Sequence, residues 1–141
     1  MSGSDSFPLN QCRVLVVDDN AAVRDMLMTC LRAWGYEPIM VADGHMALTR
    51  LALHSVKLMI TDYRMPTMDG LELLRHVRAH HRWLPVIVFS SDTAPELMRQ
   101  ATLLGARAWL PKTVSLSTLR ETVVRALQPA DQGALESNPH G

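Results

Sequence analysis

The sequence has little cysteine, few aromatic residues and no excess of charge of either sign. Only two cysteines, Cys12 and Cys30, occur among 141 residues, aromatic residues make up 5%, and 14 Lys and Arg balance 14 Asp and Glu. Two cysteines without a companion ligand cluster argue against a disulfide scaffold or a metal-cysteine site and favour the reducing cytoplasm. The zero net charge argues against binding nucleic acid by neutralising its phosphates.

Long apolar runs and an export signal are also absent. The longest apolar runs, such as residues 14–17 and 86–89, fall far short of the ~18 residues that suggest a membrane helix. The first residues have neither a positive end nor an apolar region. The chain is long enough for one core, and we expect residues 12–128 to form it. The polar ends, residues 1–11 and 129–141, are expected to be flexible.

Short apolar runs alternate with segments of helical periodicity. Strands are expected at residues 13–17, 36–41, 57–61, 85–89 and 107–110. Helices are expected at residues 20–34, 44–54, 70–81, a segment that ends near 104, and 116–127. Strands that are apolar on both faces indicate a covered sheet. The alternation therefore predicts an α/β fold with a five-stranded, parallel, doubly wound sheet and right-handed crossovers.

Two helix starts carry a capping signal. Asp69 and Glu72 have the spacing of a capping box, in which each side chain accepts a backbone N–H of the other residue. Thr93 and Glu96 have the same spacing, with Pro95 in the first turn. Both pairs are expected to begin helices.

Polar residues follow the strands where a parallel sheet would gather them. Asp18 and Asp19 follow the first strand, Asp62 the third, Ser90 ends the fourth and Lys112 follows the fifth. Functional groups of doubly wound sheets sit at the carboxyl ends of the strands. If the first and third strands are neighbours, three carboxylates share one pocket.

Three carboxylates in one pocket need a compensating charge. Asp19 alone is equally well read as a helix N-cap. Two like charges ~4 Å apart repel by about 4 kcal/mol at an effective dielectric constant of 20. Few carboxylates and several waters suit Mg²⁺, a Lys and a hydroxyl orient a phosphoryl group, and a carboxylate can accept one. The residues themselves predict Mg²⁺-dependent phosphoryl transfer to an Asp.

Four motifs resemble the receiver domain of bacterial two-component response regulators. They are VVDDN at 16–20, ITDYRMPTMDG at 60–70, PVIVFSS at 85–91 and GARAWLPK at 105–112. The resemblance implies the flavodoxin-like strand order 2-1-3-4-5. It also implies a cytoplasmic signalling phosphoacceptor, not a turnover enzyme, that takes its phosphoryl group from a sensor histidine kinase or a histidine phosphotransfer protein.

The resemblance assigns a role to each matched acid. Asp62 matches the phosphoacceptor and a ligand of the metal, Mg²⁺ or alternatively Mn²⁺. Asp19 matches a direct metal ligand and Asp18 a ligand that acts through water. The backbone carbonyl of Arg64 matches the remaining protein ligand.

The resemblance also assigns a switch. Ser90 matches the hydroxyl that binds a phosphoryl oxygen, Lys112 the Lys paired with the phosphoryl group, and Trp109 the aromatic switch. Phosphorylation of such domains remodels the face of the fourth helix, fifth strand and fifth helix through a local charge change. We therefore expect a downstream protein target, a monomer or weak homodimer, and no direct contact with nucleic acid or membrane.

One residue departs from the family pattern. Thr113 follows Lys112, where the family usually has Pro after a cis bond, and the Pro stands at 111 instead. A cis bond to a non-proline residue costs about 2.5–4 kcal/mol. The Lys112–Thr113 bond is therefore expected to be trans with a shifted loop, or else a strained cis bond.

Arg64 and Asp92 occupy two positions at which the family tunes phosphoryl lifetime. Their opposite charges would pair across the pocket mouth and obstruct the attacking water. The alternative is two solvated side chains whose pairing is worth about 0–1 kcal/mol.

Two other functions remain open. The missing Pro leaves room for a degenerate receiver that binds a protein without being phosphorylated. A small Mg²⁺-dependent phosphatase of the haloacid dehalogenase type also uses Asp, Ser or Thr, and Lys. That family has D-x-D after its first strand, whereas Asp18 and Asp19 are adjacent here and the nucleophile candidate, Asp62, follows the third strand.

Two further features have structural interpretations. Trp34 and Trp83 lie at helix ends and are expected to cover the core. The basic stretch 75–82 is expected to lie at a helix C-terminus, where the macrodipole favours cations, and not to bind nucleic acid or metal.

Overall fold

The computed structural model describes residues 12–129, and the ends predicted to be flexible, except for Pro129, lie outside this range. The strands are β1 (Arg13–Val17), β2 (Glu37–Val41), β3 (Leu58–Thr61), β4 (Val86–Ser90) and β5 (Ala108–Pro111). The helices are α2 (Ala21–Ala33), α3 (Gly44–Leu53), α4 (Gly70–His80), α5 (Pro95–Leu103) and α6 (Leu116–Ala126). Each predicted element is present, and no predicted bound differs from the observed one by more than one residue.

The five strands form one parallel sheet in the order β2-β1-β3-β4-β5, as predicted. The register places Val17, the last residue of β1, beside Val41 of β2 and Thr61 of β3. The chain segments that follow β1 and β3 therefore leave the sheet side by side, which is what brings their acidic residues together.

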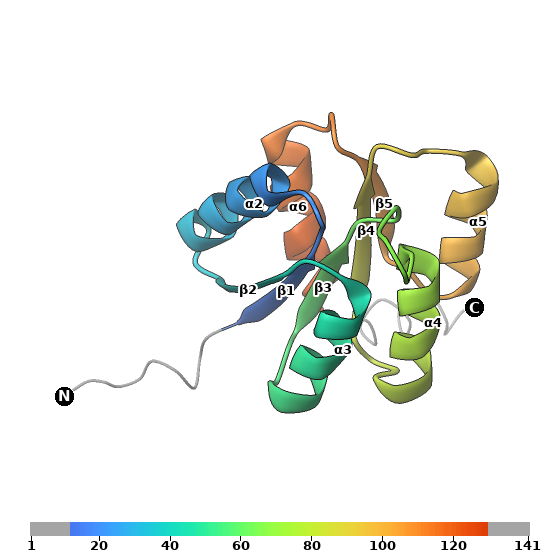
Figure 1. The fold of residues 1–141 in the computed structure, drawn as a ribbon. Helices are drawn as coiled ribbons and strands as arrows, with labels where there is room; N and C mark the ends of the chain where they lie inside the picture. The colour runs from blue at the N-terminus through green and yellow to red at the C-terminus, as the bar shows by residue number, and fades with distance from the viewer. Residues whose placement is uncertain (1–11, 130–141) are drawn as a thin grey trace, which may run out of the picture.

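Helices cover both faces of the sheet (Figure 1). The apolar cluster on one face includes side chains of α3, α4 and α5, among them Leu51, Leu74 and Ala101. The cluster on the other face includes side chains of α2 and α6, among them Leu31 and Val123. Burial of both faces explains why the strands are apolar without alternation.

The expectations about cysteines and membrane helices can be compared with the structure of residues 12–129. Cys12 and Cys30 are both free, partly buried thiols. No helix in this part of the chain has the length and hydrophobicity needed to cross a membrane.

Helix capping agrees with one prediction and contradicts the other. Asp69 and Glu72 form the predicted capping box at the start of α4, with both N···O distances at 2.9 Å. The pair Thr93 and Glu96 does not form. The N-cap of α5 is Ala94, which has no side chain to accept a hydrogen bond, and Pro95 begins the helix. The Glu96 carboxylate instead contacts Arg99, so the ion pair on the helix surface replaces the cap.

All peptide bonds in residues 12–129 are trans, including the bond between Lys112 and Thr113. This agrees with the less costly of the two predicted geometries. Pro111, placed one residue before Lys112, lies at the end of β5. Because β5 is an edge strand, a proline there does not remove an interior ladder hydrogen bond.

The basic stretch at the end of α4 contains a structural clamp. Arg78 Nε donates to the carbonyl of Leu104 (2.8 Å) and Nη2 to that of Gly105 (3.3 Å), in the turn between α5 and β5. Its Nη1 also donates to the carbonyl of Arg82 (3.1 Å). Gly105 has φ +84°, a conformation that favours glycine. Arg78 therefore ties the turns that follow α4 and α5 to each other.

We expect Arg78→Ala to lower the free energy of unfolding by about 1.5–3 kcal/mol, because hydrogen bonds from a charged donor to backbone carbonyls are lost. Urea unfolding followed by circular dichroism measures this change. Arg75→Ala is the matched control, since Arg75 lies on the exposed side of the same helix. Equal effects of the two substitutions would show that the clamp contributes nothing.

Candidate functional site

Three carboxylates meet at the carboxyl edge of the sheet. Asp18 follows β1, and its backbone N–H donates to Val41 O (3.2 Å), while the N–H of Asp62 donates to Val17 O (2.9 Å). One carboxylate oxygen from each of Asp18, Asp19 and Asp62 lies within 4.8 Å of the other two. Asp18 and Asp62 are buried and Asp19 is exposed. The adjacency of β1 and β3 thus creates the acidic pocket expected from the sequence.

Lys112 lies between two of these acids. Its Nζ is 2.8 Å from Asp18 Oδ2 and 3.0 Å from Asp62 Oδ2. Burial lowers the pKa of Lys112, but the hydrogen bonds and charges of the two carboxylates outweigh this effect and raise the pKa above its ordinary value. One ammonium group therefore offsets part of the repulsion within the pocket.

Backbone groups fix the remaining carboxylate oxygens. The N–H of Asn20 donates to Asp18 Oδ1 (2.9 Å), and the N–H of Tyr63 donates to Asp62 Oδ1 (2.7 Å). Burial raises the pKa of Asp18, and the proximity of Asp62 adds to this, although Lys112 and the Asn20 N–H act in the opposite direction. An ionised carboxylate at Asp18 is thus held at an energetic cost that a further cation would reduce.

Gly70 allows α4 to begin against this site. Its N–H donates to the carbonyl of Tyr63 (2.7 Å). A Cβ atom at this position would collide with the backbone carbonyl of Asp62. The absence of a side chain at Gly70 therefore allows the start of α4 to pack against the backbone of Asp62 and Tyr63.

A cavity of about 720 Å³ opens beside Asp62. Its lining includes Asp62, Arg64, Ser90, Ser91, Asp92, Thr93, Ala94 and Lys112. Ser90 is 1% exposed, and its Oγ accepts the backbone N–H of Asp92 (3.1 Å). The cavity thus joins a buried acid, a hydroxyl and an ammonium group, which is the set predicted to bind a phosphoryl group.

Arg64 and Asp92 form an ion pair at this cavity, as one of the two sequence interpretations proposed. Arg64 Nη2 lies 2.6 Å from Asp92 Oδ2, although the Arg64 side chain is 74% exposed. The Ala94 N–H and the Arg64 guanidinium hold the pKa of Asp92 below its usual range. The pair links the loop after β3 to the loop after β4.

Trp109 is joined to the same loop. Its Nε1–H donates to the backbone carbonyl of Asp92 (2.9 Å), and its ring lies 5.9 Å from the ring of Tyr63. Arg64 lies over the other aromatic, with Cζ 5.5 Å from the centroid of Tyr63. Sequence reasoning missed Tyr63, although its position directly after Asp62 was an available signal. Trp109 is a half-buried residue of β5, and it packs against the apolar cluster that includes side chains of α3, α4 and α5.

The remaining two tryptophans differ in environment. Trp34 packs against the apolar cluster beneath α2 and α6, as predicted. Trp83 is 86% exposed, so the prediction that it covers the core is wrong. It lies in the turn after α4 and is therefore not on the helix face that packs against the sheet.

Comparisons with known proteins agree with this geometry. The family model described as response regulator receiver domain matches residues 14–124. The chain is 32% identical over 114 residues to the transcriptional regulatory protein ZraR of Salmonella typhimurium, covering 81% of this chain and 26% of ZraR. It is 35% identical over 115 residues to the sensory/regulatory protein RpfC of Xanthomonas campestris, covering 79% and 16%.

Solved structures give the same result. The structure of Vibrio cholerae chemotaxis protein CheY4 is similar with a TM-score of 0.78 and 33% identity, covering 83% of this chain and 99% of CheY4. The two curated relatives are much longer than the matched region, and this chain spans about a quarter or less of them. Receiver domains are signalling phosphoacceptors, not enzymes with turnover, and the chain belongs to the response regulator receiver domain family.

Proposed function

We propose that Asp62 is the phosphoacceptor of this receiver domain. The observation that carries the proposal is the position of Lys112 Nζ, 3.0 Å from Asp62 Oδ2 and 2.8 Å from Asp18 Oδ2. A buried carboxylate next to a fixed ammonium group and an open cavity is positioned to attack phosphorus and to have its product charge neutralised. The same geometry argues against a degenerate receiver, because the groups that phosphoryl transfer needs are all in place.

Mg²⁺ fits the oxygen ligands of the pocket. Asp19 and Asp62 would bind it directly, Asp18 through water, and the backbone carbonyl of Arg64 would complete the protein ligands; Mn²⁺ is an alternative. When bound, the ion supplies positive charge next to the transferring phosphoryl group. The raised pKa of Asp18 supports this proposal, since an added cation offsets the cost of its buried charge.

The transfer can be written with this chain's residues. A carboxylate oxygen of Asp62 attacks the phosphorus of a partner phosphohistidine, the P–O bond forms, and the P–N bond breaks. The imidazole leaves with the bonding electrons and takes a proton from solvent. Asp62 loses its carboxylate charge, so Lys112 can transfer its ion pair to a phosphoryl oxygen while Ser90 donates to another. The domain thereby catalyses its own phosphorylation. Slow attack by water on the acyl phosphate then releases inorganic phosphate and restores the Asp62 carboxylate.

Ser90 and Trp109 are proposed to transmit the change. Ser90 lies two residues before Asp92, whose carbonyl binds the Trp109 indole at 2.9 Å. Movement of the Ser90 hydroxyl toward a phosphoryl group would therefore pull the loop that holds the indole. The surface formed by α5, β5 and α6 is the proposed binding face for a downstream protein.

The partner of a receiver domain is a histidine kinase or a phosphotransfer protein. We propose this partner, with residues 12–128 as the domain that meets it in the cytoplasm, as a monomer or weak homodimer without direct nucleic-acid or membrane contact. The haloacid dehalogenase alternative is not favoured, because the chain matches the receiver family over residues 14–124.

We expect Mg²⁺ with beryllofluoride to change tryptophan fluorescence and Asp62→Asn to abolish the change. Acetyl phosphate should likewise add one phosphoryl group to the wild type only, as read by intact-protein mass. Trp34→Phe should keep the response and Trp109→Phe should lose it. A wild-type protein that responds to neither reagent would be a degenerate receiver.

Asp19→Asn tests the acidic cluster in two ways. Without metal we expect it to stabilise the protein by about 0.5–1 kcal/mol, because like-charge repulsion falls. With metal it should weaken Mg²⁺ binding, followed by Tm against Mg²⁺ concentration. Asp25→Asn, an exposed position on α2, makes the same charge change outside the cluster. Loss of stability in metal-free Asp19→Asn would show that the carboxylates do not repel one another.

Arg64→Ala should shorten the phosphoryl lifetime several-fold, because the ion pair with Asp92 obstructs water at the cavity mouth. The rate of phosphate release from the acetyl-phosphate-labelled protein measures this. Arg64→Lys keeps the charge and should stay close to the wild type. An unchanged hydrolysis rate in Arg64→Ala would show that Arg64 and Asp92 are solvated surface side chains that do not obstruct water.

A further inference from the structure

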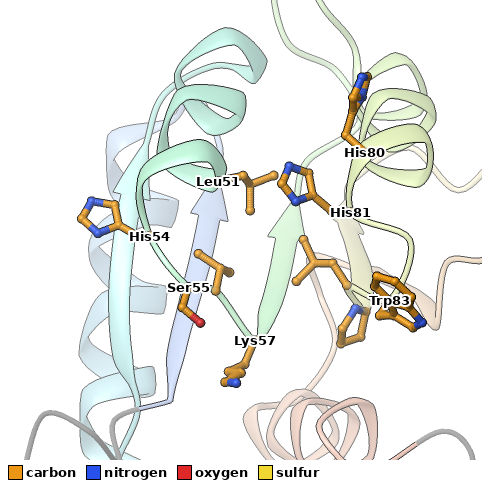
Figure 2. Close-up of a pocket in the computed structure, with 10 residues that line it drawn as sticks. Leu51, His54, Ser55, Lys57, His80, His81 and Trp83 are labelled. Atoms are coloured by element: carbon orange, nitrogen blue, oxygen red, sulfur yellow. The ribbon is translucent and has the colours of Figure 1, made fainter.

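A groove lies at the amino edge of the sheet, at the opposite end of β3 from Asp62. Figure 2 shows it between the C-terminal ends of α3 and α4, with His81 directed toward Leu51. Its volume is about 400 Å³. Its lining is formed by Leu51, His54, Ser55, Val56, Lys57, His80, His81, Trp83, Leu84 and Pro85. From Leu58 to Asp62, β3 separates the groove from the phosphorylation pocket by about 13 Å.

The ionisable groups of this lining are all bases. Lys57 carries an ammonium group, the three histidines carry ring nitrogens, and no lining residue is an acid. Figure 2 shows the His81 ring directed into the groove and the His54 and His80 rings directed away from it. Glu37, an acid at the same edge of the sheet, is paired with Arg13 at 3.4 Å. Lys57 offers positive charge, and the ring N–H groups of the histidines offer hydrogen-bond donors, and both suit a carboxylate. The helix ends themselves carry partial negative charge, so an anion would be bound through these side chains and not through backbone amides.

The floor and rim of the groove are apolar. Leu51 and Leu84 are buried beneath it, each 7% exposed, while Trp83 stands on the rim at 86% exposure. Trp is among the residue types enriched at the energetically dominant positions of protein interfaces. An apolar side chain of a partner would be removed from water by contact with both the floor and the Trp83 ring.

The turn that carries Trp83 is held in place before any partner binds. Leu84 N–H donates to the carbonyl of His81 (3.0 Å), and Arg78 Nη1 donates to the carbonyl of Arg82 (3.1 Å). A fixed turn loses little entropy on binding. The clamp that stabilises the fold therefore also fixes the position of the exposed Trp83 ring.

We propose that this groove is a second docking surface, which binds an acidic segment of a protein partner that carries an apolar side chain between carboxylates. Charge complementarity with Lys57 and a hydrogen bond from the His81 ring select the acidic segment, and Trp83 with Leu84 binds the apolar side chain. This surface is separate from the residues proposed for the phosphoryl switch, and binding to it does not require phosphorylation of Asp62.

The test uses the full chain, unphosphorylated, and the acetylated, amidated peptide Glu-Glu-Leu-Glu-Glu as the probe. Chemical shifts in ¹H–¹⁵N spectra, including the Trp83 indole assigned with Trp83→Phe, report the contact. We expect saturable shifts at Trp83, His81 and Lys57 with a dissociation constant on the order of 1 mM, as befits a small contact. Replacing the peptide Leu by Ser should weaken binding several-fold.

Two exposed substitutions test the two parts of the groove. Lys57→Glu and Trp83→Ser should each weaken binding by about tenfold or more. Their controls are Arg75→Glu and Leu103→Ser, which make the same kinds of change at exposed positions outside the groove. All four variants should keep the beryllofluoride response, which separates this proposal from the proposed function.

Three results would overturn the proposal. The first is the absence of saturable shifts at the groove. The second is equal binding of a Lys-Lys-Leu-Lys-Lys peptide or of inorganic phosphate, which would remove the need for an acidic segment. The third is displacement of the peptide by polyuridine with tighter binding, which would identify a nucleic-acid surface.

Discussion

The ammonium group of Lys112, which lies between two buried carboxylates, is the interaction on which the site depends. Asp18 and Asp62 follow adjacent parallel strands, and their charges would repel strongly without a cation between them. Lys112 reaches them from the end of the edge strand β5. The position of its Nζ therefore depends on the arrangement of β1, β3 and β5 in the sheet. Its trans bond to Thr113, in place of the usual cis proline, does not prevent this contact.

A series of side-chain contacts connects the loops beside the pocket to the edge strand β5. Arg64 binds the Asp92 carboxylate, and the Asp92 carbonyl binds the Trp109 indole, whose ring packs near Tyr63. The loops after β3 and β4 are thereby tied to the edge strand. In the proposed function, a charge added at Asp62 would act on this connected set of contacts and would reach the α5–β5–α6 face through them.

Local sequence signals predicted the elements well where the chain itself supplied the interaction. Asp69 caps α4 as expected because its partner, Glu72, lies three residues away and has no stronger partner. Thr93 does not cap α5, because Pro95 begins the helix from Ala94 and Glu96 pairs with Arg99. Whether Glu96 pairs with Thr93 or with Arg99 depends on the three-dimensional geometry, which the four-residue capping pattern does not specify.

The sequence by itself determined the alternation of strands and helices, the family, and the set of acids, hydroxyl and lysine at the strand ends. These follow from periodicity and from motifs whose spacing is fixed along the chain. Only the tertiary structure decided which oxygens Lys112 contacts, that Tyr63 and Trp109 are neighbours, and that Trp83 is exposed above a basic groove. Those features arise where segments distant in sequence pack together, and their distances depend on the whole sheet.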